Sequence, residues 1–367
     1  MEELEKNLTE ENNTELTTDT TLATAESGDE LHGENLTERV KVLSPGMTVV
    51  KRFFRSKLSI VGLVTLILLF LFSFLGPLFS PWSANQGAVV DYQNKKDSFS
   101  YSAVTWVDEE GVTHEVMDVV FSTPVYNSLG DTSLIHWMGT DEYGYDVFTR
   151  LMYGGRVSLT IGFVVVILET LIGVILGGLA GYFGKWVDNL IMRIVDVLSC
   201  IPQLPIMLIL GVVFESMGLG DSILKLYYMM IVLTLIGWTG TARLVRGQIL
   251  SLREQEFMLA AKCSGLSTAK KIFKHLMPNV IPQLIVSMTL GLGSIILMEA
   301  TLGYLGIGAP DGTATWGNLI NLASESVYRN YYPNLWLGSG ICITLAILAF
   351  NFVGDGLRDA FDPKMKR

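Results

Sequence analysis

Charged residues, cysteine and histidine are all scarce in this sequence. Only 17% of its 367 residues are charged, and it has three cysteines and four histidines. No two cysteines are spaced as CxxC, so neither a disulfide framework nor a Cys/His metal site is indicated. A Walker A motif is also missing, because Gly184-Lys185 is followed by Trp186 rather than by Ser or Thr. We therefore expect no catalytic site, no metal and no cofactor bound by this chain, and the chain is not predicted to be an enzyme.

Long apolar runs are what the sequence has instead. Half of its residues are hydrophobic, and the mean hydropathy is +0.41. A helix needs about 20 apolar residues to cross a bilayer, and six runs approach that length, at 58–79, 157–183, 197–214, 226–242, 280–302 and 335–354. The predicted fold class is an all-α polytopic membrane protein with six transmembrane helices. Pro202 and Pro205 interrupt the third run, which predicts a bent helix that lines a cavity.

The net charge of −10 belongs to the N-terminal tail. Residues 1–40 contain twelve acidic and two basic residues, so the rest of the chain is neutral. A segment this polar cannot bury enough apolar surface to fold alone, and we predict that it is disordered. Four basic residues at 51–57 precede the first apolar run, which places the N-terminus in the cytoplasm by the positive-inside rule. Six spans then return the C-terminus to the same side.

These features divide the chain into five parts. They are an acidic disordered cytoplasmic tail at 1–45, a basic flank with the first span at 46–80, a small extracytoplasmic insertion at 81–156, a core domain at 157–355 with a cytoplasmic loop at 246–279, and a cytoplasmic tail at 356–367. In the insertion, residues 101–106 and 116–121 are aromatic or β-branched and flank an acidic turn, which predicts a β-hairpin. In the second span, glycines at three- and four-residue spacing predict a close helix contact.

The loop at 246–279 is the most distinctive part of the sequence. Residues 260–263 are compatible with a helix that Gly265 ends, as a glycine at a helix C-terminus does. Ser267 is the predicted N-cap of a second short helix, whose apolar residues recur at i, i+3, i+4 and i+7. Pro278 is expected to close this unit. By themselves these residues allow two readings, an ordinary positively charged loop or a specific docking element.

The same loop resembles the Glu-Ala-Ala loop of ABC-importer permeases. That pattern is Glu-Ala-Ala, three residues, Gly, nine residues and Ile-x-Leu-Pro; here Leu259 stands at the Glu and His275 at the Ile. Both departures are typical of the peptide and nickel branch of the family. The residues that match the pattern or this branch are Glu256, Phe257, Ala260, Ala261, Gly265, His275, Pro278 and Asn279. The resemblance implies that the loop docks in a groove of a separate ATPase subunit, with the two small alanines allowing a close approach beside Phe257 and Leu259.

Two further segments resemble the C-type subunits of peptide importers. One precedes the second span and matches a Gly-Thr-Asp segment through Gly139, Thr140, Asp141, Gly144, Asp146 and Arg150. Tyr145 stands where these subunits usually have Arg. The other is the ending at 351–364, which is similar to Asn-x-x-Gly-Asp-x-x-Arg-Asp followed by Asp-Pro. Asp146 precedes a helix as a cap would, with Arg150 one turn later, so we favour a structural role for the first segment over substrate contact.

Glu169 and Glu299 are the acidic residues deepest in the predicted spans. A carboxylate in a span is costly and usually faces the bundle interior or water. Residues 299–306 resemble a Glu-x-x-Leu-x-x-Leu-Gly segment of the same permeases. Glu299 is therefore expected either to line the transport pathway or to hold helices together, and for Glu169 the second role is favoured.

The resemblance implies a permease subunit of a binding-protein-dependent ABC importer with the type I fold, in a bacterial cell membrane. A paralogous permease would complete the pathway for oligopeptides or dipeptides in the lipid bilayer. Two cytoplasmic ATPase subunits would use ATP, an extracytoplasmic binding protein would deliver the peptide, and no nucleic acid is involved. Nickel or another small solute is an alternative cargo. An ion-coupled secondary transporter is a rival class, but it requires inverted repeats and coupled ionisable residues in the spans.

Overall fold

The computed structural model describes residues 45–80, 102–107, 113–118, 137–139, 145–218, 224–310 and 312–362. The predicted acidic tail up to residue 44, Asp141, and residues 363–367 lie outside this part of the chain. Strands β1 (Ser102–Val107) and β2 (Thr113–Asp118) form the predicted hairpin, with Val107 opposite Thr113. The second strand begins three residues earlier than expected, because only residues 108–112 connect the two strands.

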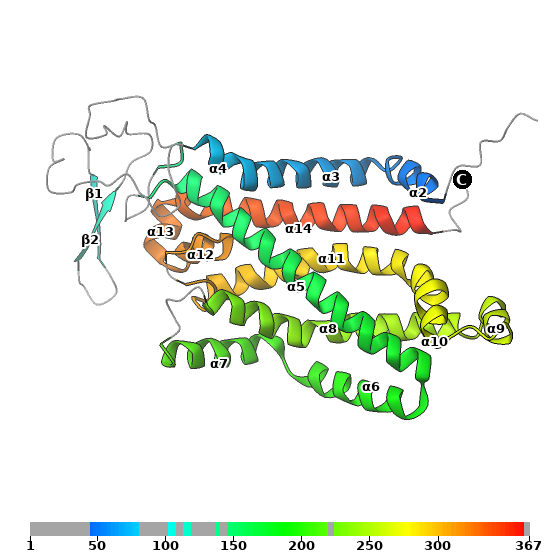
Figure 1. Ribbon diagram of the computed structural model, residues 1–367. Helices are drawn as coiled ribbons and strands as arrows, with labels where there is room; N and C mark the ends of the chain where they lie inside the picture. The colour runs from blue at the N-terminus through cyan, green and yellow to red at the C-terminus, as the bar shows by residue number, and fades with distance from the viewer. Residues whose placement is uncertain are drawn as a thin grey trace, which may run out of the picture. The chain divides into compact units, whose positions relative to one another are not determined.

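Within the described residues, five helical runs are long and apolar enough to cross a membrane. They are α3 (Lys57–Phe70) continued by the π turn η1 (Leu71–Leu75) and α4 (Gly76–Phe79), α5 (Val147–Phe183), α8 (Leu224–Leu252), α10 (Thr268–Lys270) with η2 (Lys271–Leu276) and α11 (Met277–Tyr304), and α14 (Pro333–Phe361). A sixth span is possible by length and composition if α6 (Lys185–Cys200) and α7 (Gln203–Ser216) count as one, bent by 77°. The prediction of an all-α polytopic chain is confirmed (Figure 1).

Several helices extend beyond the runs that hydropathy marked out. Helix α5 begins at Val147 rather than at residue 157, α8 continues to Leu252, and α14 reaches Phe361. Residues 185–193, which lie between the predicted second and third spans, belong to α6. The reason is the same in each case: apolar length reports only the part of a helix that can lie in hydrocarbon, whereas backbone hydrogen bonding continues into polar residues.

Glycines bring α5 against α8, the most extensive helix contact of the fold. A Cβ on Gly173 would lie 2.6 Å from the side chain of Thr241, and one on Gly177 would lie 2.9 Å from the Cα of Ala242. On Gly181 it would lie 2.9 Å from Ile249. The predicted close contact through small residues is therefore present, and any larger side chain at these positions would push the two helices apart.

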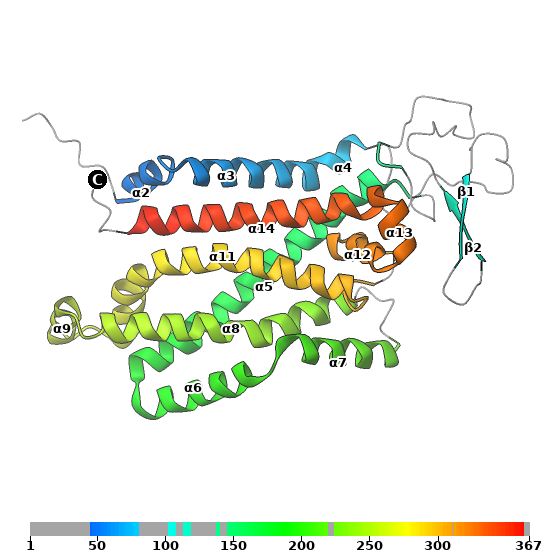
Figure 2. The same ribbon diagram turned by 180° about the vertical axis from the view of Figure 1, so that it is seen from behind.

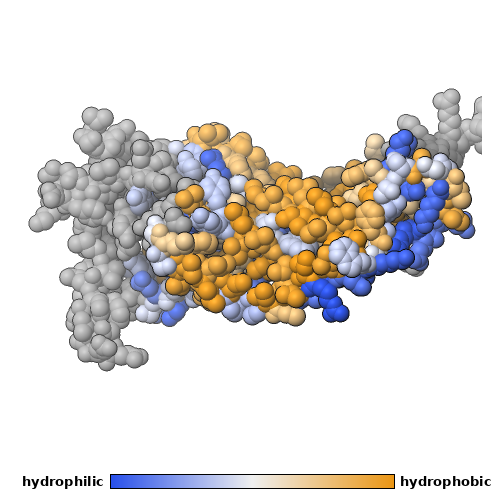
Figure 3. Space-filling view, turned by 60° about the horizontal axis from the view of Figure 1, so that its bottom comes forward, coloured by the Kyte–Doolittle hydropathy of each residue, from blue (hydrophilic) through white to orange (hydrophobic). Residues whose placement is uncertain are grey.

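The remaining long helices lie side by side. Figures 1 and 2 show α14 between α3 and α11, while α5 crosses α11 and α8 obliquely. Two short helices, α12 (Trp316–Asn321) and α13 (Ser326–Tyr331), fill the connection between α11 and α14. The outward-facing residues of the long helices are largely apolar; Leu68 and Val212, for example, are each 60% exposed. Figure 3 shows the same on one face, with hydrophobic surface across the middle and hydrophilic residues gathered towards one end.

That hydrophilic end collects three parts of the chain that are distant in sequence. Helix α2 (Pro45–Phe53), the last turn of α14 and α9 (Glu256–Cys263) all lie there in both views (Figures 1 and 2). The Arg52 guanidinium donates to the backbone carbonyl of Asp362 at 3.0 Å, which links the first and the last of the described helices. The short helices α12 and α13 lie at the opposite end.

Candidate functional site: the α9 docking element and the bundle behind it

The loop between α8 and α11 consists of two helical segments joined at Gly265. Helix α9 ends there, and Gly265 has φ of 66°, in the left-handed region that glycine enters readily. Its N–H donates to the Lys262 carbonyl at 3.1 Å, and the N–H of Leu266 donates to the carbonyl of Ala261 at 3.4 Å. This pair of bonds is the Schellman motif of helix ends. The predicted stop at Gly265 is therefore confirmed.

The second segment does not close at Pro278, and that prediction is wrong. Ser267 occupies the N-cap position of α10, although its hydroxyl makes no capping bond. From α10 the chain passes through the π turn η2 into α11 as one helical run. Pro278 lies in the first turn of α11, just after the wider π turn. Because the run is continuous, a proline here interrupts the backbone hydrogen bonding within a helix, and the π turn directly before it is where the bonding pattern changes.

The inner side of α9 packs on the bundle. Met258 is fully buried and Ala261 is 5% exposed. Met258 belongs to an apolar cluster with residues of α8, η2 and α11, which are Val245, Ile249, Leu276, Val280 and Leu284. Ala261 therefore faces the chain's own core, contrary to the expectation that both alanines meet a partner. The orientation of α9 is fixed by this packing, and only its outer side is open.

The outer side presents apolar residues that nothing in the described chain covers. Phe257 is 36%, Leu259 62% and, on η2, Phe273 74% exposed. Ala260 and Glu256 are exposed as well, while His275 is half-buried and its carbonyl accepts a 2.7 Å bond from the Asn279 amide. We call the unit from α9 to η2, residues 256–276, the docking element, and Phe257, Leu259, Ala260 and Phe273 its outer residues. Exposed aromatic and aliphatic side chains on a rigid support are typical of an interaction surface.

At the opposite end of the bundle, Asp146 and Arg150 hold the beginning of α5. The Asp146 carboxylate accepts the Thr149 N–H at 2.7 Å, which confirms the predicted N-cap. The Arg150 guanidinium lies 5.2 Å from the centre of the Tyr145 ring, a cation–π distance. The Tyr145 ring thus faces the cation of Arg150.

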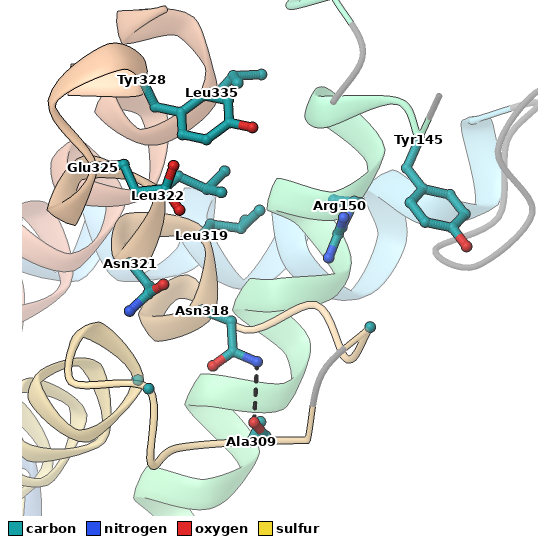
Figure 4. Close-up of a pocket in the computed structure, with 13 residues that line it drawn as sticks. Tyr145, Arg150, Ala309, Asn318, Leu319, Asn321, Leu322, Glu325, Tyr328 and Leu335 are labelled. Atoms are coloured by element: carbon teal, nitrogen blue, oxygen red, sulfur yellow. Dashed lines mark hydrogen bonds between the residues drawn. The ribbon is translucent and has the colours of Figure 1, made fainter. Parts of the chain in front are cut away.

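A cavity of about 430 Å³ lies beside this helix start, between α5, the end of α11, α12 and α13 (Figure 4). Arg150 lies on its α5 side and Glu325 on the side of α12 and α13. The Asn318 amide holds the turn below by donating to the carbonyls of Ala309 and Thr313, at 3.3 and 3.1 Å. The volume of the cavity falls in the range of roughly 300–1,000 Å³ that is typical of small-molecule sites.

Trp316 fastens α12 to α5, and sequence reasoning assigned it no role. Its indole N–H donates to the Leu151 carbonyl at 3.0 Å, its backbone N–H donates to the Ser158 hydroxyl at 3.1 Å, and the side chain is fully buried.

Glu299 is also fully buried, with the Ser158 and Thr315 hydroxyls beside its carboxyl group. Within the described chain, Glu299 therefore lies between α5, α11 and α12 and does not face an open cavity.

The other candidate residues of the spans, Glu169, Pro202 and Pro205, lie at a helix contact and at the break in the third span. Glu169 is 9% exposed, and its carboxyl group lies against Gly237 of α8, so closely that a Cβ on that glycine would collide with it. Pro202 is the N-cap residue of α7 and Pro205 lies in its first turn, so the predicted break at these prolines is present. Both prolines are exposed. Among the residues that the structure describes, no group of three His, Cys, Asp or Glu side chains could hold a metal.

The family of the chain follows from comparison with known proteins. A family model described as binding-protein-dependent transport system inner membrane component matches residues 173–367, which include the whole docking element. The chain belongs to this family. A second model, the N-terminal TM domain of oligopeptide transport permease C, matches residues 44–97. The permease is therefore a multi-pass membrane protein, and the expected fold class, a type I ABC importer transmembrane domain, agrees with this family.

Three similar proteins illustrate the relation. The permease is 35% identical to the oligopeptide transport system permease protein OppC of Bacillus subtilis, over 89% of this chain and 92% of that protein. It is 36% identical to the dipeptide transport system permease protein DppC of the same organism, over 86% and 85%. It is 32% identical to OppC of Haemophilus influenzae, over 86% and 87%.

Three arginines of the permease form pairs that no sequence motif indicated. Arg246 of α8 holds both carboxylate oxygens of Asp188 in α6, and Arg243 pairs with Asp196 at 3.1 Å. Arg253, just after α8, donates to the carbonyl of Gly181 at 3.0 Å. The partners are 47 to 72 residues apart in sequence. For the two ion pairs the signal in the sequence was acidic residues on α6 and basic residues on α8; the carbonyl partner of Arg253 gave no signal.

Proposed function

We propose that the permease is the C-type subunit of an ABC importer for oligopeptides or dipeptides. The observation that carries this proposal is the docking element, a rigid helix–glycine–helix unit whose outer residues are apolar and uncovered. The names of the similar proteins, which are oligopeptide and dipeptide permeases, support peptide as the cargo rather than nickel. On this proposal the permease forms the pathway together with a paralogous permease.

The docking element faces the cytoplasm. Its end of the bundle also holds the basic residues of α2 and of the α8–η2 region, such as Lys51, Arg52, Lys270 and Lys274, and cytoplasmic loops carry an excess of basic residues. Both chain termini then lie inside the cell. Two ATPase subunits bind the outer residues of the docking elements and hydrolyse the ATP, while the permease itself binds no nucleotide and catalyses no reaction.

The cavity beside Arg150 and Glu325 then faces the outside, where a binding protein delivers the peptide. Helices α6 and α7, with Pro202 and Pro205 at their bend, line the pathway, because broken helices are tolerated where backbone borders a cavity. Glu299 acts as a lock between helices rather than as a contact for the peptide. Its complete burial within the described chain supports this role.

Reconstitution in proteoliposomes tests the proposal. The permease, its paralogue and the two ATPase subunits are incorporated, and uptake of a labelled tripeptide is measured with ATP inside and the binding protein outside. We expect uptake that requires both. Uptake of Ni²⁺ in place of peptide would contradict the cargo assignment. Uptake driven by an ion gradient without ATPase subunits would contradict the whole class.

A further inference from the structure

We propose that Arg246 and Arg253 lock the docking element to the corner between α5 and α6, so that α9 and α6 move as one body. This inference rests on the proposed function, because it concerns how the movement of α9 reaches the spans. No contact of this kind is part of the loop pattern that identified the docking element. It follows from the positions of the two guanidinium groups.

The connection between α8 and α9 is short and bonded. Only residues 253–255 separate the two helices. The Arg253 N–H donates to the Ile249 carbonyl at 2.9 Å, and the Gln255 N–H donates to the Leu252 carbonyl at 3.2 Å. Met258 of α9 and Ile249 of α8 share one apolar cluster and are fully buried. A displacement of α9 is therefore transferred to the end of α8, where Arg246 lies in the helix and Arg253 directly follows it.

Arg253 joins α8 to the end of α5. Its Nη1 donates to the carbonyls of Gly181 and Tyr182, at 3.0 and 3.4 Å. These carbonyls belong to the last turn of α5, where intrahelical partners are missing and a cation is favoured by the helix dipole. Gly184, which follows, has φ of 64°, and a Cβ there would lie 3.1 Å from the same Nη1. The guanidinium thus fits closely against the corner.

Arg246 joins α8 to the beginning of α6, on the other side of that corner. It binds Asp188 through Nε and through Nη2, the latter at 2.6 Å. Such a two-bonded pair fixes direction as well as distance, which a lysine cannot do. The side chains of Arg246 and Asp188 are only 33% and 15% exposed, so water screens this pair less than the Arg243–Asp196 pair, whose side chains are 48% and 58% exposed.

The two arginines therefore hold both arms of the α5–α6 corner to the same stretch of α8. Beyond α6 the chain bends by 77° into α7. A movement of α9 would thus be transmitted through α8 to α6 and, across the bend, to α7. Without the two guanidinium groups, α9 would keep its apolar contacts with α8, and α5 would keep its glycine contact with α8. The beginning of α6 would lose the charged contact that ties its movement to that of α8.

Spin labels on native cysteines test this directly. Cys263 at the end of α9 and Cys200 at the end of α6 are exposed, whereas Cys342 is buried. In the reconstituted complex, we expect one narrow distribution of label distances that is the same with and without ATP. Arg246→Ala combined with Arg253→Ala should broaden it and make it depend on ATP, while Arg243→Ala should leave it unchanged. An unchanged distribution in the double variant, or an ATP-dependent one in the wild type, would overturn the inference.

Transport measurements give a second, independent result. For the double variant we expect normal copurification with the ATPase subunits, ATP hydrolysis that continues, and a fall of about fivefold or more in peptide transported per ATP, the size of a typical coupling between sites. Arg246→Lys should lie between wild type and Arg246→Ala. Equal loss of copurification and transport would mean that the arginines only maintain the fold. Failure of the wild type to transport any peptide would refute the proposed function instead, and the label distances would still decide the inference.

Discussion

Gly265 allows a test of how the docking element is held. Its φ of 66° belongs to a conformation that costs a residue with a Cβ about 1–2 kcal/mol. No heavy atom lies within 4 Å of a Cβ built there, so the cost of a substitution is backbone strain alone. Asn tolerates this region better than Ala, and a β-branched Val tolerates it least. The expected order of damage is therefore Asn, Ala, Val, which differs from the order of side-chain size because Asn is larger than Ala.

A strain of this size changes the ratio between molecules with α9 packed on the bundle and molecules with α9 displaced from it by about 5- to 30-fold. Hydrogen exchange of the α9 amides measures that ratio, and peptide-stimulated ATP hydrolysis by the reconstituted complex measures its consequence. Both should change in the order Asn, Ala, Val, while the complex still assembles in the membrane.

Gly247 provides the matched control. It is an exposed residue inside α8, it has no positive φ, and a Cβ there also meets open space. Gly247→Ala should be neutral or slightly stabilising, since Ala favours the helix. The reasoning is refuted if damage at Gly265 follows side-chain size, with Asn worse than Ala, or if Gly247→Ala causes the same loss.

Three further expectations concern other parts of the chain. Ala260→Trp should reduce copurification with the ATPase subunits while α9 stays folded, whereas Ala261→Trp should displace α9 by overpacking at a cost of about 1–3 kcal/mol; limited proteolysis of the loop distinguishes the two. Asp146→Ala removes a helix cap and should lower the stability of the chain by about 1 kcal/mol, seen as a lower Tm in detergent. Gly177→Leu should separate α5 from α8 and reduce the amount of permease in the membrane. Gly178→Leu, whose nearest neighbour would be 3.8 Å from the Cβ, should do so much less.

Features that depend on neighbours in the chain could be predicted from the sequence. The spans follow from apolar length, the break at Pro202 from the missing N–H, and the stop at Gly265 from its freedom at positive φ. The cap at Asp146 follows from a carboxylate placed directly before a helix. The family pattern located the docking element for the same reason, since its residues lie within one short stretch.

Features that depend on which side of a helix packs could not be predicted. Ala260 and Ala261 are identical in chemistry, and only the apolar cluster behind α9 decides that Ala261 points inward. Pro278 was predicted to end a helix, but the helical run continues through it, with a π turn directly before it.

Contacts between residues distant in sequence were decided by the tertiary structure alone. Trp316 finds its carbonyl partner 165 residues away, and Arg246 finds Asp188 at 58 residues. A charge or an indole in a sequence shows that a partner is needed when it is buried, but not which one. The sequence thus determined that this chain crosses a membrane and carries a helix–glycine–helix loop. Only the packing of α8, η2 and α11 around Met258 decided which side of that loop is buried.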